Sequence, residues 1–220
     1  MNVGVGVLAG LAGLAAGIGV TVYALAVPAE GRLPRPSLSM LRGHRARDLF
    51  LGVVGAGLVS AAVGGAVGCS RLLLAYWLCG LSAVALAIID LRRRRLPFAI
   101  TGGMYLVCGV TFLIESAVSR DAAALLRATG IAALTLGGFL VLALALPGQL
   151  GLGDVVFTGW IVFSLGWFSW RAAVLGLVVG LLVQLAAVGV LGLGSSRSRL
   201  LPMGPALLAG WVVGLLITQG

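Results

Sequence analysis

Two of the six acidic residues in this chain lie at the ends of strongly apolar segments, where an ionisable group is costly. Asp90 closes the run AVALAIID and is followed, after Leu91, by four arginines, and Asp154 follows the loop PGQLGLG at the start of another apolar run. Two facing carboxylates share a proton, because like charges a few ångströms apart cannot both ionise, and the pair titrates as a unit. The ionised carboxylate can deprotonate water while the protonated one polarises a carbonyl, which is the chemistry of acid–base peptide hydrolysis.

Both aspartates also allow a purely structural interpretation. Asp90 could form ion pairs with the arginines that follow it, Arg92 to Arg95. Asp154 could be the N-cap of a helix, a role that aspartate fills well. The other four acidic residues lie in an arginine-rich loop or at the outer ends of apolar runs, where solvent or headgroups account for them. They are Glu30, Asp48, Glu115 and Asp121.

The composition identifies the solvent in which these residues must act. Of the 220 residues, 60% are hydrophobic and 10% are charged, and the mean hydropathy is +1.16. Soluble domains carry about 25% charged residues, so this chain is suited to lipid. Its length is that of one domain, and we expect residues 1–220 to form a single membrane domain.

Eight apolar runs approach or exceed the length of about 20 residues that a helix needs to cross a bilayer. They predict an all-α, polytopic transmembrane bundle of about eight helices. The run at 155–169 is short enough to be tilted, broken or flanked by a re-entrant segment. The eight runs are 3–27, 48–69, 72–90, 98–117, 128–147, 155–169, 172–194 and 202–218.

The first apolar run is interpreted as a retained helix. No positive charge precedes it, and it is longer than the core of a secretory signal, which is about 7 to 15 residues. The expected organisation is a first transmembrane helix at 1–27, a short basic loop at 28–47 and a core bundle at 48–220.

The arginines set the expected orientation. All 15 basic residues are arginines, giving a net charge of +9, and 11 of them fall in the loops 28–47, 91–97 and 195–201. The positive-inside rule places these loops in the cytoplasm and the N-terminus outside. Two helices separate Asp90 from Asp154, so both reach the cytoplasmic face. Anchoring to the lipid bilayer accounts for the arginines, and no nucleic-acid partner is predicted.

Cysteine, histidine and tryptophan offer no cofactor site. Three unpaired cysteines and the single His44 cannot build a zinc or haem site, so no metal or cofactor is predicted. The cysteines are expected to be small buried side chains. Three tryptophans are expected to form an interfacial aromatic belt near the outer end of the sixth helix. The cysteines are Cys69, Cys79 and Cys108, and the tryptophans are Trp160, Trp167 and Trp170.

Two glycines precede Asp154 in the sequence GLGD. Gly151 and Gly153 leave the neighbouring backbone free of side chains, so an extended peptide could approach the carboxylate closely. With 35 glycines in 220 residues, a GxGD pattern arises readily by chance and is weak evidence by itself.

Three blocks of sequence, in order, resemble the prepilin peptidases, membrane aspartyl proteases of the GxGD type that trim the leaders of type IV pilins and pseudopilins. The first block is AIIDLRRRRLPFAIT, at 87–101, in which the family's catalytic aspartate precedes a basic turn and Leu-Pro. The second is GLGD, at 151–154, and the third is LPMGPALLAG, at 201–210, which is similar to the family's Pro-x-Gly-Pro entry into the last helix.

The resemblance implies an aspartic-type endopeptidase of the bacterial plasma membrane, with Asp90 and Asp154 as the catalytic pair and no metal. Its substrate would be a prepilin or pseudopilin, cut after a short basic leader at the cytoplasmic border. Gly151 and Gly153, together with the Pro202–Gly204 turn, are expected to border the substrate. The loop 28–47 is short and lacks cysteine, which resembles short forms without the methyltransferase domain that serve Flp-type pili.

Other functions remain open at this stage. Val156 stands where the family usually has lysine, so the chain could be an inactive relative. A non-enzymatic membrane subunit or a proton- or ion-coupled transporter could also hold paired acids, although transporters more often place them near the bilayer midplane. A presenilin-type peptidase is expected to have Tyr-Asp where this chain has Ile89–Asp90. The sequence predicts neither the particular pilin nor the oligomeric state.

Overall fold

The computed structural model describes residues 2–27, 46–147, 150–192 and 202–218. Over these ranges the chain is helical apart from short turns, which confirms the predicted all-α bundle of eight helices. The predicted loop 28–47 lies outside the described residues, except that Ala46 and Arg47 begin a helix. The helices are α1 (Val3–Ala26), α2 (Ala46–Val67), α3 (Leu73–Arg93), α4 (Phe98–Ser119), α5 (Ala123–Ala145), α6 (Leu152–Phe168), α7 (Trp170–Gly192) and α8 (Gly204–Ile217).

The described helices indicate a multi-pass membrane protein. Six of them, α1 to α5 and α7, are long and apolar enough to cross a membrane. α6 and α8 are apolar but shorter, with 17 and 14 residues. At a rise of about 1.5 Å per residue, both fall short of a hydrocarbon core of about 30 Å.

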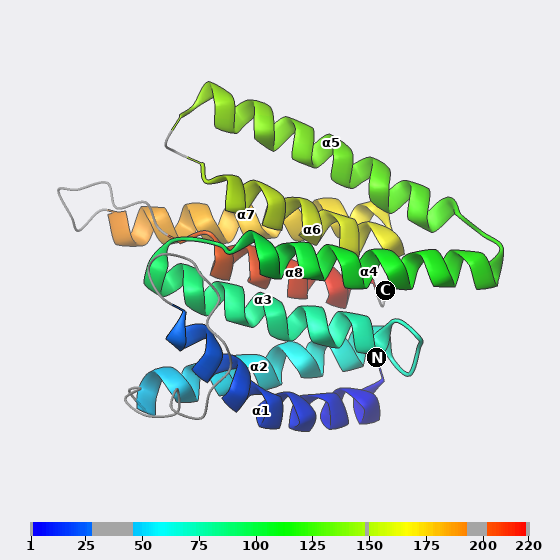
Figure 1. Cartoon of the computed structure of the whole chain (residues 1–220), viewed down its shortest axis with the longest axis horizontal. Coiled ribbons are helices and arrows are strands. Elements are labelled where there is room, and N and C mark those ends of the chain that lie inside the picture. Colours follow the sequence, from blue (N-terminus) through cyan, green and yellow to red (C-terminus); the bar gives the residue numbers. More distant parts are fainter. Residues whose placement is uncertain (1, 28–45, 148–149, 193–201, 219–220) are drawn as a thin grey trace.

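The helices pack side by side along the long axis of the molecule (Figure 1), with α1 and α2 at one edge and α5 at the other. Between these edges, α3, α6 and α8 contribute most of the buried core, including the fully buried rings of Tyr76, Trp160 and Trp211. The outward faces of α1, α5 and α7 expose leucine and valine side chains, as contact with lipid requires.

Three hydrogen-bonding side chains tie the central helices together. The hydroxyl of Tyr76 in α3 donates to the carbonyl oxygen of Ser164 in α6 at 2.5 Å. The indole N–H of Trp211 in α8 donates to the hydroxyl oxygen of Ser164 at 2.9 Å. The rings of Tyr76 and Trp211 also stack, with centroids 6.4 Å apart. These contacts fix α3, α6 and α8 relative to one another.

Arg127 explains the largest difference between a predicted and an observed helix boundary. α5 begins at Ala123, five residues before the apolar run 128–147 that predicted it, and so includes Arg127. In the structure its guanidinium donates to three carbonyl oxygens at the end of α6, those of Gly166 at 2.9 Å, Trp167 at 2.5 Å and Phe168 at 3.2 Å. The charge is therefore satisfied within the bundle.

Two predictions about individual side chains were wrong. Trp160 does not belong to an interfacial belt: it is fully buried and stacks on Phe157 with ring centroids 5.9 Å apart, whereas Trp170 is 57% exposed. Cys79 and Cys108 are buried as expected, with their Sγ atoms 3.6 Å apart, but Cys69 is exposed. It lies in the turn between α2 and α3, beyond the packed part of both helices.

Candidate active site

Asp90 lies in the last turn of α3, which continues for three residues beyond it to Arg93. Arg94 then ends the helix in the left-handed conformation, with φ of 51°, and its N–H donates to the carbonyl oxygen of Asp90 at 2.8 Å. Only 4% of Asp90 is exposed. Its carboxylate is therefore held inside the bundle, near one end.

The first turn of α8 meets this carboxylate. The backbone N–H of Gly204 donates to Oδ2 of Asp90 at 2.7 Å, and the backbone amide of Met203 also interacts with the carboxylate. A Cβ placed on Gly204 would lie 3.0 Å from Oδ2 and 3.2 Å from Cβ of Asp90. Glycine at this position therefore permits the close approach.

Asp154 is the third residue of α6, and Gly151 is the N-cap. The proposed N-cap role of Asp154 is therefore wrong. Its backbone N–H donates to the carbonyl oxygen of Gly151 at 3.0 Å, and its carboxylate interacts in return with the backbone amide of Gly151.

The second glycine of GLGD packs against the chain between α3 and α4. A Cβ on Gly153 would lie 2.9 Å from Cβ of Leu96 and 3.1 Å from its carbonyl oxygen. Gly151 lies beside the acid itself, since a Cβ there would be 2.9 Å from Oδ2 of Asp154. The two glycines thus let the start of α6 approach the segment that follows Asp90.

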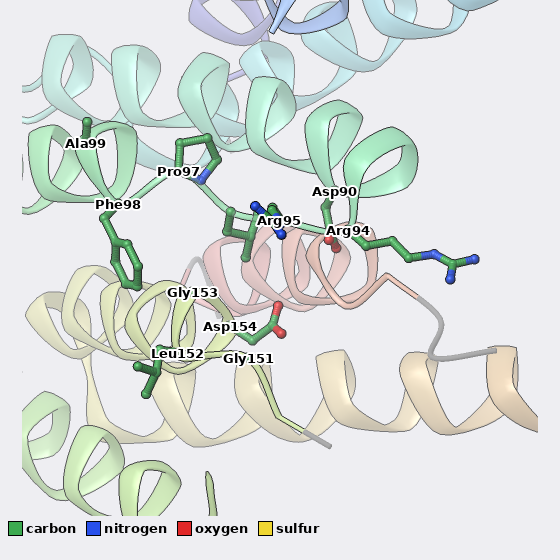
Figure 2. Close-up of a pocket in the computed structure, with 11 residues that line it drawn as sticks. Asp90, Arg94, Arg95, Pro97, Phe98, Ala99, Gly151, Leu152, Gly153 and Asp154 are labelled. Carbon is green, nitrogen blue, oxygen red and sulfur yellow. The ribbon is translucent and has the colours of Figure 1, made fainter. Parts of the chain in front are cut away.

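Both carboxylates line one cavity of about 480 Å³ at the end of the bundle. Figure 2 shows them on facing sides, with Asp90 from α3 and Asp154 from α6 pointing toward one another. They are near enough to repel each other electrostatically. The prediction that two distant parts of the sequence bring both acids to the same end of the bundle is confirmed.

The four consecutive arginines after Asp90 separate in space. Arg92 pairs with Asp48 of α2, and no ion pair of Asp90 is found among the described residues. Arg94 and Arg95 line the cavity. The sequence analysis had instead assigned all four arginines to anchoring at the lipid headgroups. Arg92 and Arg93 belong to α3, in which successive residues are rotated by about 100°, and Arg94 leaves the helix in the left-handed conformation, so neighbouring arginines point to different sides.

The predicted substrate-binding residues fall into two groups. Gly151 and Gly153 line the cavity with the aspartates, as do the exposed side chains of Phe98 and Leu152. Pro202 and Gly204 are not among the described lining residues, and the Gly204 N–H instead donates to the carboxylate of Asp90. Sequence analysis did not single out Phe98 and Leu152, although they lie within the blocks 87–101 and 151–154.

The arrangement is suited to acid–base chemistry, because an ionised and a protonated carboxyl that face each other can act as base and acid. Comparisons with protein-family models, curated proteins and solved structures gave no match. Among the described residues, no three histidine, cysteine or acidic side chains cluster closely enough to hold a metal ion. What the described site offers is a pair of facing carboxylates, two arginines and an apolar rim around one cavity.

Proposed function

We propose that this protein is a membrane aspartyl endopeptidase of the prepilin peptidase type, with Asp90 and Asp154 as its catalytic pair. The observation that carries the proposal is the single cavity that both carboxylates line, at one end of a bundle of apolar helices. The resemblance of the three sequence blocks to that family adds the substrate class, a prepilin or pseudopilin.

The reaction requires one ionised and one protonated carboxyl. The ionised carboxylate takes a proton from water, whose oxygen attacks the peptide carbonyl carbon, while the other carboxyl gives its proton to the carbonyl oxygen. In the second step the first carboxyl returns its proton to the amide nitrogen and the second takes a proton from a hydroxyl group. The C–N bond breaks, a carboxylic acid and an amine leave, and the pair regains its starting state.

The position of the cavity supports cleavage at a membrane border. Asp90 and Asp154 lie near the ends of apolar helices, which would place the cut bond where a substrate leaves the lipid. Phe98 and Leu152 offer apolar contacts beside the carboxylates. Arg94 and Arg95 would repel a basic leader, so its positive residues would lie outside the cavity.

The proposed location is the bacterial plasma membrane, with the carboxylates at the cytoplasmic side. The support is the run of arginines 92–95 that follows Asp90, together with the arginines that the sequence places between α1 and α2 and between α7 and α8, because the positive-inside rule assigns such segments to the cytoplasm.

The test is leader removal from a candidate prepilin co-expressed with the protein. Asp90→Asn and Asp154→Asn are each expected to abolish cleavage, because either change leaves one step without its proton carrier. Asp121→Asn is the matched control: its carboxylate Oδ1 accepts a hydrogen bond from Ala123 at the start of α5, a role that asparagine keeps. Full cleavage by either active-site variant would show that the pair is not catalytic. Failure of the wild type on every pilin-like substrate would favour an inactive relative or a transporter.

A further inference from the structure

We propose that the first turn of α8 gives the two carboxylates different roles, holding Asp90 as the ionised base and leaving Asp154 as the proton donor. The inference rests on the proposed peptidase function. It also predicts a difference in the chemical state of the two side chains that can be measured without any substrate.

Asp90 receives its stabilising contacts from a separate helix. The Gly204 N–H donates to Oδ2 at 2.7 Å, and the Met203 amide interacts with the same carboxylate. Both amides belong to the start of α8, where free N–H groups carry partial positive charge. Hydrogen bonds to a carboxylate favour its ionised form, so this turn opposes protonation of Asp90.

The charged groups around the pair also favour a negative charge on Asp90 over one on Asp154. Among the described residues, the charged side chains that line the cavity are the two aspartates, Arg94 and Arg95. The guanidinium of Arg94 attracts the carboxylate of Asp90 electrostatically. For Asp154 the principal charged neighbour is Asp90, which repels it when both are ionised.

Fewer contacts stabilise the ionised form of Asp154 than that of Asp90. Its carboxylate interacts with one backbone amide, that of Gly151, within its own turn. Its place in the first turn of α6 adds a dipole contribution, but a dipole at a helix start contributes less than a direct hydrogen bond to a charged group. Burial disfavours the ionised form of both carboxyls, and the dipole at the C-terminal end of α3 also opposes a negative charge on Asp90. Direct contacts with a charged group are stronger than this dipole, so two amides and a guanidinium on Asp90 against one amide on Asp154 place the shared proton on Asp154.

Contacts with two neighbouring helices fix α8 in the position from which its first turn contacts Asp90. A Cβ on Gly210 would overlap the carbonyl oxygen of Gly176 in α7, so the two helices are in backbone contact. At the other side, Trp211 donates to Ser164 of α6. The Gly204 N–H is therefore presented to Asp90 by a helix that is anchored to both α6 and α7.

The direct test labels the two carboxyl groups in the full-length protein in detergent, followed by peptide mapping. A diazoacetyl ester with Cu²⁺ esterifies a protonated carboxyl, whereas an epoxide alkylates an ionised carboxylate. We expect the diazo reagent to modify Asp154 and the epoxide to modify Asp90. Reversed labelling, equal labelling of both residues by one reagent, or no diazo ester on Asp154 would overturn the assignment.

A second test changes Gly204, the residue whose N–H contacts the carboxylate of Asp90. Gly204→Ala places a Cβ against Asp90 and is expected to lower kcat about tenfold or more while KM changes less than about twofold. Loss of the amide contact should also move the acidic limb of the kcat–pH profile to higher pH. Gly109→Ala is the control, because a Cβ there meets open space. An unchanged kcat and pH profile in folded Gly204→Ala protein would refute the role of α8.

The two proposals fail in different ways. Asymmetric labelling in a protein that cleaves no peptide would leave the division of the carboxylates standing and refute the peptidase function. Cleavage that requires both aspartates, together with reversed labelling, would keep the function and refute the role of α8.

Discussion

Gly153 lies against the backbone of Leu96, so that a Cβ on the glycine would be 2.9 Å from the Cβ of the leucine. Gly153 adjoins Asp154 at the start of α6, and Leu96 lies in the connection between α3, which carries Asp90, and α4. The contact therefore sets the separation of the two segments that carry the carboxylates.

Gly153→Ala is expected to reduce kcat/KM about 10- to 100-fold, because a displacement of about 1 Å between catalytic groups has effects of that size. The measurement is leader cleavage by purified protein, with thermal unfolding in detergent to verify the fold. Gly109→Ala, whose Cβ meets open space, should behave as the wild type. Wild-type kinetics for Gly153→Ala would mean that the contact does not position the pair.

The helical fold could be predicted from the sequence because the length of an apolar run is a local property of the chain. Each run near 20 residues predicted one helix, and alternation of sides brought Asp90 and Asp154 to one end. The partner of Asp90 was not predictable in this way. Gly204 lies 114 residues away, and its amide reaches the carboxylate only because α8 packs against α3.

Individual side chains departed from the sequence prediction where tertiary contacts decide the outcome. Trp160 is a typical interfacial residue by type, yet α6 is a central helix and buries it. Arg127 would be costly in a lone apolar helix, but three carbonyl oxygens of α6 satisfy it. Hydropathy describes the average environment of a segment and not the neighbours of one side chain.

Neutralising the cavity arginines should improve binding of a substrate with a basic leader. Arg94→Gln and Arg95→Gln are each expected to lower KM by up to about fivefold, because each removes a partly solvated like-charge repulsion. The effect should shrink at high salt. Arg93→Gln is the control, since Arg93 does not line the cavity. A higher KM in the two cavity variants would indicate that these arginines bind the substrate.

Arg127 is expected to contribute to stability more than another arginine at the same end of α6. Arg127→Met removes the donors to three carbonyl oxygens and should lower the free energy of unfolding by about 1.5–3 kcal/mol. Arg171→Met loses only a contact 5.8 Å from the ring centroid of Trp170, which is worth about 0.5–1 kcal/mol. Chemical unfolding of both variants in one detergent compares them, and equal losses would contradict the capping role of Arg127.

The three cysteines should differ sharply in their reactivity toward a water-soluble maleimide. Cys69 is exposed in the turn between α2 and α3, whereas Cys79 and Cys108 are buried against each other, and only a solvated thiol forms the reactive thiolate readily. In the folded protein we expect labelling of Cys69 alone, detected by mass spectrometry. Cys69→Ser should abolish it and Cys79→Ser should leave it unchanged. Unfolding in sodium dodecyl sulfate should expose all three thiols. Labelling of Cys108 in the folded wild type would contradict the packing of α3 against α4. Because the connection between these two helices carries Arg94 and Arg95, it would also contradict their position in the cavity.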